Sequence, residues 1–279
     1  MTATTVPRRS LARRRGRLNR AVGDTVAIAG RNLVTIVRLP QLLVFSTIQP
    51  VIFVLLFRYA FGGAINTPGL SYVDYLMPGI FAQTVAFGSM GTGVGLAEDL
   101  TKGLIERFRS LPMARSAVLA GRILSDLVRN LFVVALMCAV GFAVGFRLHN
   151  NLVAFLIALV LLLLFGCALS SMFALVGLSV PSGEAAQAVA FPMLGPLVFA
   201  SSAFVPIGSM PGWLQAFAKH QPVSVVIDAM RALSQGDAAA GVLSQGASTA
   251  RYVVQSLVWT AVILAVFGPL AVRRYRRAT

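Results

Sequence analysis

Residues 98–116 read EDLTKGLIERFRSLPMARS and form a short charged segment between two long apolar stretches. Asp99 or Thr101 is expected to cap a helix that runs to about Ser110 and stops before Pro112. Its apolar face holds Leu104, Ile105, Phe108 and Leu111, and its charged face holds Lys102, Glu106, Arg107 and Arg109. Such a helix can seat its apolar face in a groove of a partner protein. An interfacial loop helix without a partner explains the pattern equally well.

A second charged set, Arg122, Asp126 and Arg129, recurs at intervals of four and three residues and therefore shares one helical face. Three such charges facing lipid at mid-bilayer would cost roughly 8–10 kcal/mol. We expect them at or below the inner interface, with Asp126 bridging the two arginines. This inner ion cluster has either a structural role or a role in subunit contact or gating.

Catalytic motifs are missing from the chain. The two lysines, Lys102 and Lys219, lie outside any GxxxxGK[ST] sequence, so no phosphate-binding loop of that type exists. HExxH, CxxC and GxSxG are also absent, which argues against zinc sites and a serine hydrolase. No acidic residue lies in the middle of an apolar run, where an ion-coupled carrier usually needs one. Energy for any work must therefore come from a partner.

The elements that position these residues are expected to be membrane helices. Hydrophobic residues make up 57% of the 279-residue chain, charged residues 12%, and the mean hydropathy is +0.80. Apolar runs long enough to cross a hydrocarbon core of roughly 30 Å recur along the chain. The predicted fold is an all-α integral membrane protein with six transmembrane helices, at about 41–62, 75–97, 117–146, 152–178, 188–206 and 252–271.

Basic residues gather in three places, which are the tail up to Arg38, the segment from Lys102 to Arg129, and the last residues from Arg273 to Arg277. With an even number of spans these all lie on one side, which the positive-inside rule places in the cytoplasm. The net charge of +15 thus favours anionic lipid over nucleic acid as the contact of the tail. Residues 1–20 and 273–279 are predicted to be cytoplasmic tails around a membrane domain, 21–272, in the bacterial plasma membrane.

Several local features refine this topology. Residues 21–38 have one apolar stripe and should form an interfacial helix. Pro50 should kink the first span, and Pro192 and Pro196 should interrupt the fifth. Small residues in GSMGTGVG (88–95) permit close helix packing.

The stretch 207–250 is predicted to be a helical hairpin that dips into the outer leaflet between spans 5 and 6. Ser224 is expected to cap its second helix, in which Asp228 and Arg231 can pair across one turn. Trp213 suits an outer interface position.

Three segments resemble the type-2 permease family of ABC exporters, and its daunorubicin-resistance branch in particular. They are YLMPGIFAQ (75–83), EDLTKGLIERFRSLPMAR (98–115) and FVPIGSMPGWLQAFAKHQPVSVVIDAMRALSQG (204–236). The second is quite specific, with its acidic pair, Lys-Gly, Glu-Arg and Ser-Leu-Pro in order. In the third, Gln221-Pro222 stands where the family often has Asn-Pro.

The resemblance implies a permease chain that pairs with a second permease, identical or paralogous, above two ABC ATPase subunits that bind ATP and Mg²⁺. This chain would bind no cofactor itself. The interfacial helix and residues 98–112 would contact the ATPases, and spans 1, 2 and 5 would open a path for a hydrophobic or amphipathic substrate. The ATPase-coupling residues would then be Glu98, Asp99, Lys102, Glu106, Arg107, Phe108 and Arg109.

Aromatic residues on the presumed path suit an apolar substrate, although helix packing accounts for each of them as well. They are Phe45, Phe53, Phe57, Phe81, Phe87, Phe191 and Phe199. The alternative function is that of an integral membrane protein without an ATPase, either a secondary carrier or an assembly scaffold. In that case Glu98, Glu106 and Arg107 should tolerate substitution, and any transport should follow an ion gradient.

Overall fold

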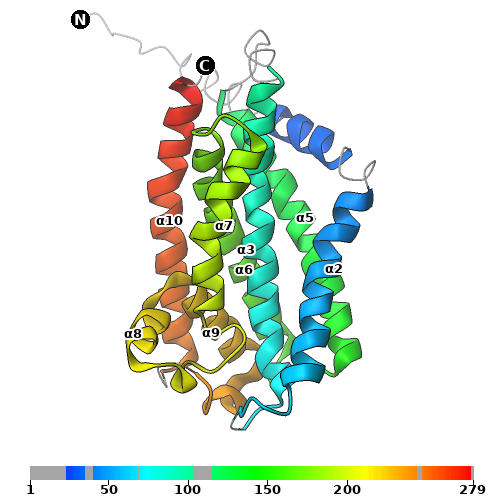
Figure 1. Ribbon diagram of the computed structural model, residues 1–279, viewed down its shortest axis with the longest axis vertical. Coiled ribbons are helices and arrows are strands. Elements are labelled where there is room, and N and C mark those ends of the chain that lie inside the picture. The colour runs from blue at the N-terminus through cyan, green and yellow to red at the C-terminus, as the bar shows by residue number, and fades with distance from the viewer. Residues whose placement is uncertain (1–22, 35–39, 68, 104–114, 244–246, 278–279) are drawn as a thin grey trace, which may run out of the picture.

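The computed structural model describes residues 23–34, 40–67, 69–103, 115–243 and 247–277. Within these ranges every regular element is a helix and no strand occurs, as the composition predicts. The long helices run along one common direction and form a bundle around α3 (Figure 1). Residues 23–34 form a separate helix at the end of the bundle where the carboxyl end of α10 lies.

The longer helices are α2 (Pro40–Leu56), which continues into the π-helix η1 (Phe57–Phe61), α3 (Tyr72–Thr101), α5 (Arg115–Val144), α6 (Leu152–Gly177) and α10 (Thr249–Arg277). The shorter helices are α7 (Gly183–Phe199), η2 (Ile207–Ser209), α8 (Gly212–His220), α9 (Pro222–Gln235) and η3 (Gly236–Ala239).

Four helices in the described part of the chain are long and apolar enough to cross a membrane, namely α3, α6, α10 and the stretch Ala117–Val144 of α5. The first predicted span corresponds to α2 with η1, of which Thr47–Phe61 is a shorter apolar helix. The fifth corresponds to α7, which has 17 residues. The chain is thus a helical membrane protein with four candidate membrane-spanning helices among its described residues.

The centre of the bundle is α3, which contacts α2, α5, α6, α7 and α9. Its most apolar window is 72% buried, whereas that of α10 is 17% buried. Glycines allow the neighbours to approach closely: a Cβ on Gly177 of α6 would lie 2.1 Å from the carbonyl oxygen of Gly93. The small-residue segment predicted to permit close packing therefore lies at the crossing of α3 and α6.

Three local predictions are wrong. Helix α7 is not interrupted, because it continues through Pro192 and Pro196 to Phe199; the fixed φ of proline is itself helical, although each proline removes one N–H donor. Ser224 does not cap α9, which begins at Pro222 with the Gln221 side chain accepting a hydrogen bond from the Val223 N–H.

The third wrong prediction concerns the end of α3. Asp99 and Thr101 are not N-caps, because both lie inside α3, which extends to Thr101 before Gly103 adopts a positive φ of 66°. The Thr101 hydroxyl donates to the carbonyl oxygens of Ala97 and Glu98 in the preceding turn. Span 2 and the charged segment are thus joined without a break at residue 98.

Helix α9 is buried from Val223 to Gln235 and packs against α3, α6 and α10. Its expected ion pair is present, with Arg231 and Asp228 2.8 Å apart and both fully buried. The Arg231 guanidinium also donates to the carbonyl oxygens of Tyr75 and Ser202 and lies 3.8 Å from the centre of the Tyr75 ring. These contacts fix the end of the bundle opposite to helix 23–34.

Candidate functional site

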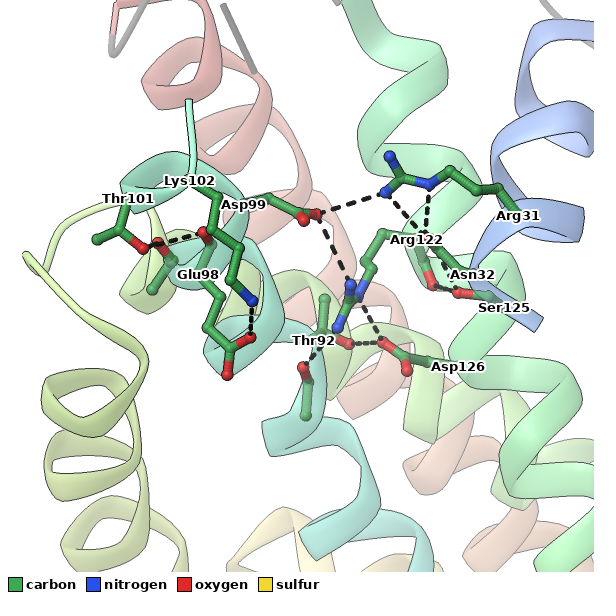
Figure 2. A network of polar contacts seen from close by, with 12 residues as sticks. Arg31, Asn32, Thr92, Glu98, Asp99, Thr101, Lys102, Arg122, Ser125 and Asp126 are labelled. Atoms are coloured by element: carbon green, nitrogen blue, oxygen red, sulfur yellow. Dashed lines mark hydrogen bonds and ion pairs between the residues drawn. The ribbon is translucent and has the colours of Figure 1, made fainter. Parts of the chain in front are cut away.

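Asp99, in the last turn of α3, is the centre of a polar network that joins three helices (Figure 2). One of its carboxylate oxygens lies 3.9 Å from Arg31 of helix 23–34 and 3.7 Å from Arg122 of α5. The Asp99 side chain is only 14% exposed, so these ion pairs are less screened than pairs on an open surface. A displacement of this end of α3 would therefore change its ion pairs with both helix 23–34 and α5.

Asp126 of α5 continues the network toward the middle of the bundle. It lies 3.9 Å from Arg122 and 3.5 Å from Arg129, so that it bridges the two arginines as the spacing predicts. Thr92 of α3 donates a hydrogen bond to the same carboxylate. The Asp126 side chain is 3% exposed, and its charge is compensated almost entirely inside the protein.

Glycines of α3 make room for the two guanidinium groups. A Cβ on Gly95 would lie 1.6 Å from a terminal nitrogen of Arg122, and a Cβ on Gly91 would lie 2.8 Å from one of Arg129. The groups also donate to α3 carbonyl oxygens, Arg122 to that of Gly91 and Arg129 to that of Gly88. The segment 88–95 thus packs against charged side chains of α5 on one face and against the backbone of α6 on another.

Helix 23–34 is held on α5 by a second set of contacts. Asn32 accepts hydrogen bonds from Arg31 and donates to the Ser125 hydroxyl over 3.4 Å. A Cβ on Gly121 would lie 2.8 Å from Ile28, which shows how closely the two helices approach. Four residues of the network were not predicted from the sequence, namely Arg31, Asn32, Thr92 and Ser125. The only sequence signal for Arg31 and Asn32 was their place on the polar face of the helix expected at 21–38.

The predicted coupling residues divide into two groups. Lys102 forms a salt bridge of 2.9 Å with Glu98 across one turn at the exposed end of α3, beside Asp99. The Glu98 side chain also lies against α7, since a Cβ on Gly183 would be 3.0 Å from it. Glu106, Arg107, Phe108 and Arg109 lie outside the described residues, and their role in coupling stays a prediction.

The predicted path aromatics fall into separate places. Phe53, Phe57 and Phe199 surround Phe204, with ring centres 4.6 to 5.9 Å from it. Phe87 and Phe191 form a second pair, 5.8 Å apart, between α3 and α7.

The remaining two path aromatics lie apart from these groups. Phe81 is fully buried in the core against Phe146 and Phe155. The side chain of Phe45 in α2 lies outside the described residues. The structure thus groups five of the seven into two aromatic clusters along α2, α3 and α7.

The network consists of ion pairs and hydrogen bonds between charged and polar side chains of three helices. Among the described residues there is no group of three or more His, Cys, Asp and Glu side chains placed to hold a metal ion. The charged groups instead alternate in sign across helix boundaries, from Arg31 through Asp99 and Arg122 to Asp126 and Arg129. Such an arrangement couples the positions of the helices that carry it.

Residues 24–234 match the model of the ABC-2 type transporter family. The chain belongs to this family. It is 33% identical over 256 residues to the daunorubicin resistance ABC transporter permease protein DrrB1 of Streptomyces coeruleorubidus, covering 92% of this chain and 87% of that relative. It is 32% identical over 248 residues to a probable doxorubicin resistance ABC transporter permease protein, DrrC, of Mycobacterium tuberculosis, covering 84% and 81%.

A more distant relative is a putative transport permease, ycf38, of Cyanophora paradoxa, with 25% identity over 218 residues and coverage of 76% of this chain and 74% of that relative. The family match begins inside helix 23–34 and extends to α9. The network around Asp99 and Asp126 therefore lies within the part of the chain that defines an ABC-2 permease.

Proposed function

We propose that this ABC-2 permease is the transmembrane subunit of an ATP-driven exporter that moves a hydrophobic or amphipathic compound outward across a bacterial plasma membrane. Six spans, with α2 and α7 as the first and fifth, would place both termini in the cytoplasm. The membrane domain would comprise residues 21–272, and α8 and α9 would form the hairpin at the outer leaflet. ATP and Mg²⁺ would be bound by partner ATPase subunits, and a second permease chain would complete the path.

Family membership over residues 24–234 carries the proposal. The names of the two bacterial relatives support a drug-like substrate, since one is described as a daunorubicin resistance permease and the other as a probable doxorubicin resistance permease. The exposed apolar side chains along α2 and α7, such as Ile52, Phe191 and Phe199, support contact of these helices with lipid or with a second permease chain.

The position of the charged segment supports coupling to an ATPase. The segment follows α3 directly, and Asp99 in the last turn of α3 is paired with arginines of helix 23–34 and α5. A push on residues 98–112 from an ATPase would thus reach three helices at once. Outward transport is supported by the names of the resistance permeases alone.

The test is co-purification of the permease with a candidate ABC ATPase expressed in the same cells. We expect stable co-elution and ATP hydrolysis with the native chain, and loss of both with Glu106→Ala plus Arg107→Ala. The matched control is Asp237→Ala plus Arg251→Ala, which also removes one acid and one base but at the opposite end of the bundle. A well-folded permease that never retains an ATPase would favour the partner-free carrier or scaffold instead.

A further inference from the structure

A cavity of about 190 Å³ lies between α2, α3 and α5 and is bordered by Arg129 of the ion cluster. Gln49 of α2, Gln83 and Phe87 of α3, and Arg129 and Asn130 of α5 are among its lining residues. One water molecule needs roughly 10–15 Å³ of cavity volume, so this cavity is large enough for an aromatic ring or a lipid headgroup. Its outer wall is α2, whose neighbouring residues Ile48 and Ile52 are exposed.

The lining carries two buried amide side chains in a segment expected to lie in the bilayer. Gln83 is 3% exposed, and its carbonyl oxygen is buried without a hydrogen bond in the described part of the chain. Asn130 is 5% exposed and lines the same cavity from α5. A buried amide oxygen without a partner is costly, above all where no bulk water is present, so Gln83 points to a polar ligand.

The charge of the lining limits the kind of ligand. Arg129 brings a positive charge, but Asp126 lies 3.5 Å from it and the Gly88 carbonyl accepts from it. An anion would gain little from a guanidinium that is already neutralised, and it would face the Gln83 carbonyl oxygen. A hydroxyl group fits better, because it can donate to Gln83 and accept from the Asn130 amide.

We propose that this cavity binds a hydroxyl-bearing amphipathic molecule within a single permease chain. The hydroxyl lies between Gln83 and Asn130, and the apolar body lies against Phe87 and Val133. This site is separate from the aromatic group around Phe204, which lies at the α2–η1 end of the path. That the bound molecule is the transported substrate rests on the proposed function; the binding itself does not.

Two fluorescent probes of nearly equal size test the site, pyrenylmethanol and methylpyrene, which differ in one hydroxyl. Binding is measured by fluorescence anisotropy to the full permease in phosphatidylcholine nanodiscs, with empty nanodiscs correcting for partition into lipid. We expect pyrenylmethanol to bind about tenfold more tightly than methylpyrene, because only the alcohol satisfies the buried amides. Equal protein-dependent binding of the two probes would overturn the proposal.

Variants then assign the preference to the cavity. Gln83→Leu should abolish the tenfold preference for the alcohol, whereas Gln187→Leu, the same change at an exposed position of α7, should keep it. Asn130→Leu changes the second amide of the lining, on another helix, and should give the same loss, which covers a failure of Gln83→Leu to fold. A preference that survives in both cavity variants would place the hydroxyl elsewhere.

The outcome is independent of the exporter proposal. If the native chain prefers the alcohol but never retains an ATPase, the binding site stands and the exporter function fails. If an ATPase is retained while both probes bind equally, the exporter stands and the cavity is not a hydroxyl site.

Discussion

At the scale of single residues, Asp126 is the most constrained charge of the network. It is the carboxylate between Arg122 and Arg129, and Thr92 also donates to it. Arg122 keeps a second partner in Asp99, whereas the only ion pair of Arg129 within the described residues is with Asp126. Removing the charge of Asp126 therefore leaves Arg129 uncompensated inside the bundle.

We predict that Asp126→Asn lowers the free energy of unfolding by about 3 kcal/mol, since an unpaired buried charge is costly and asparagine preserves shape and the bond from Thr92. Unfolding of the purified permease in mild detergent measures the change. Glu184→Gln, an exposed acid in the first turn of α7, should shift stability by no more than about 0.5 kcal/mol.

A second substitution separates charge from packing at this position. Asp126→Leu together with Arg129→Leu removes both members of the pair and should recover much of the lost stability. If the double variant is no more stable than Asp126→Asn, the two residues do not act as a compensating pair.

At the scale of helices, the close crossing of α3 and α6 depends on paired glycines. A Cβ on Gly177 would meet the Gly93 carbonyl oxygen at 2.1 Å, and one on Gly93 would meet the Phe173 carbonyl oxygen at 2.5 Å. Both obstacles are backbone atoms, which cannot turn aside as a long side chain can. The helices themselves would have to separate.

Gly177→Ala is therefore predicted to destabilise the permease by about 2 kcal/mol, despite the better helix propensity of alanine. Gly30→Ala is the matched control, because a Cβ there meets nothing within 4 Å, and it should be neutral or slightly stabilising. Detergent unfolding compares the two, and equal stabilities would show that α3 and α6 do not need this close approach.

The sequence predicts the helices that are encoded by a local pattern of residues. It does not predict contacts between residues that are far apart in the chain. The fourth span was predicted at 152–178 and is observed as Leu152–Gly177, because an unbroken aliphatic run follows the capping Asn151. Helix α9 was expected from its sequence, but its burial against α3, α6 and α10 was not. Its polar Arg231 is satisfied by the Tyr75 carbonyl oxygen, 156 residues away in the chain, which no local pattern reveals.

The candidate site divides in the same way. The pairs of Asp126 with Arg122 and Arg129 lie within one helix and follow from spacing of three and four residues. The pairs of Asp99 join α3 to two other helices and depend on how those helices pack. The inner ion cluster could therefore be predicted from the sequence, but its connection to helix 23–34 could not.

At the scale of the whole molecule, the two ends of the bundle differ in character. Helix 23–34, the end of α3 and the basic end of α10 share one end, and α8, α9 and η3 share the other (Figure 1). Arg274 of α10 donates a hydrogen bond to the Leu178 carbonyl oxygen at the end of α6. This bond holds the basic end of α10 against the end of α6. In the proposed topology, which follows the positive-inside rule, this end lies in the cytoplasm.

We predict the corresponding orientation in cells. With Cys138 and Cys167 replaced by alanine, Ser209→Cys should react with a membrane-impermeant maleimide added to intact spheroplasts, because the exposed Ser209 of η2 lies on the outer side in the proposed topology. Lys102→Cys, at the exposed end of α3, should react only in inverted vesicles. Labelling of both positions from the same side would contradict the proposed topology.

The glycines beneath the two arginines also govern how this chain can change through evolution. Every missense mutation of Gly95 adds a Cβ that would overlap the Arg122 guanidinium, 1.6 Å away. A larger residue at position 95 would turn this guanidinium away from the Gly91 carbonyl oxygen and from Asp99, so its cost is the loss of these contacts. The size of residue 95 and the presence of an arginine at position 122 should therefore covary across ABC-2 permeases.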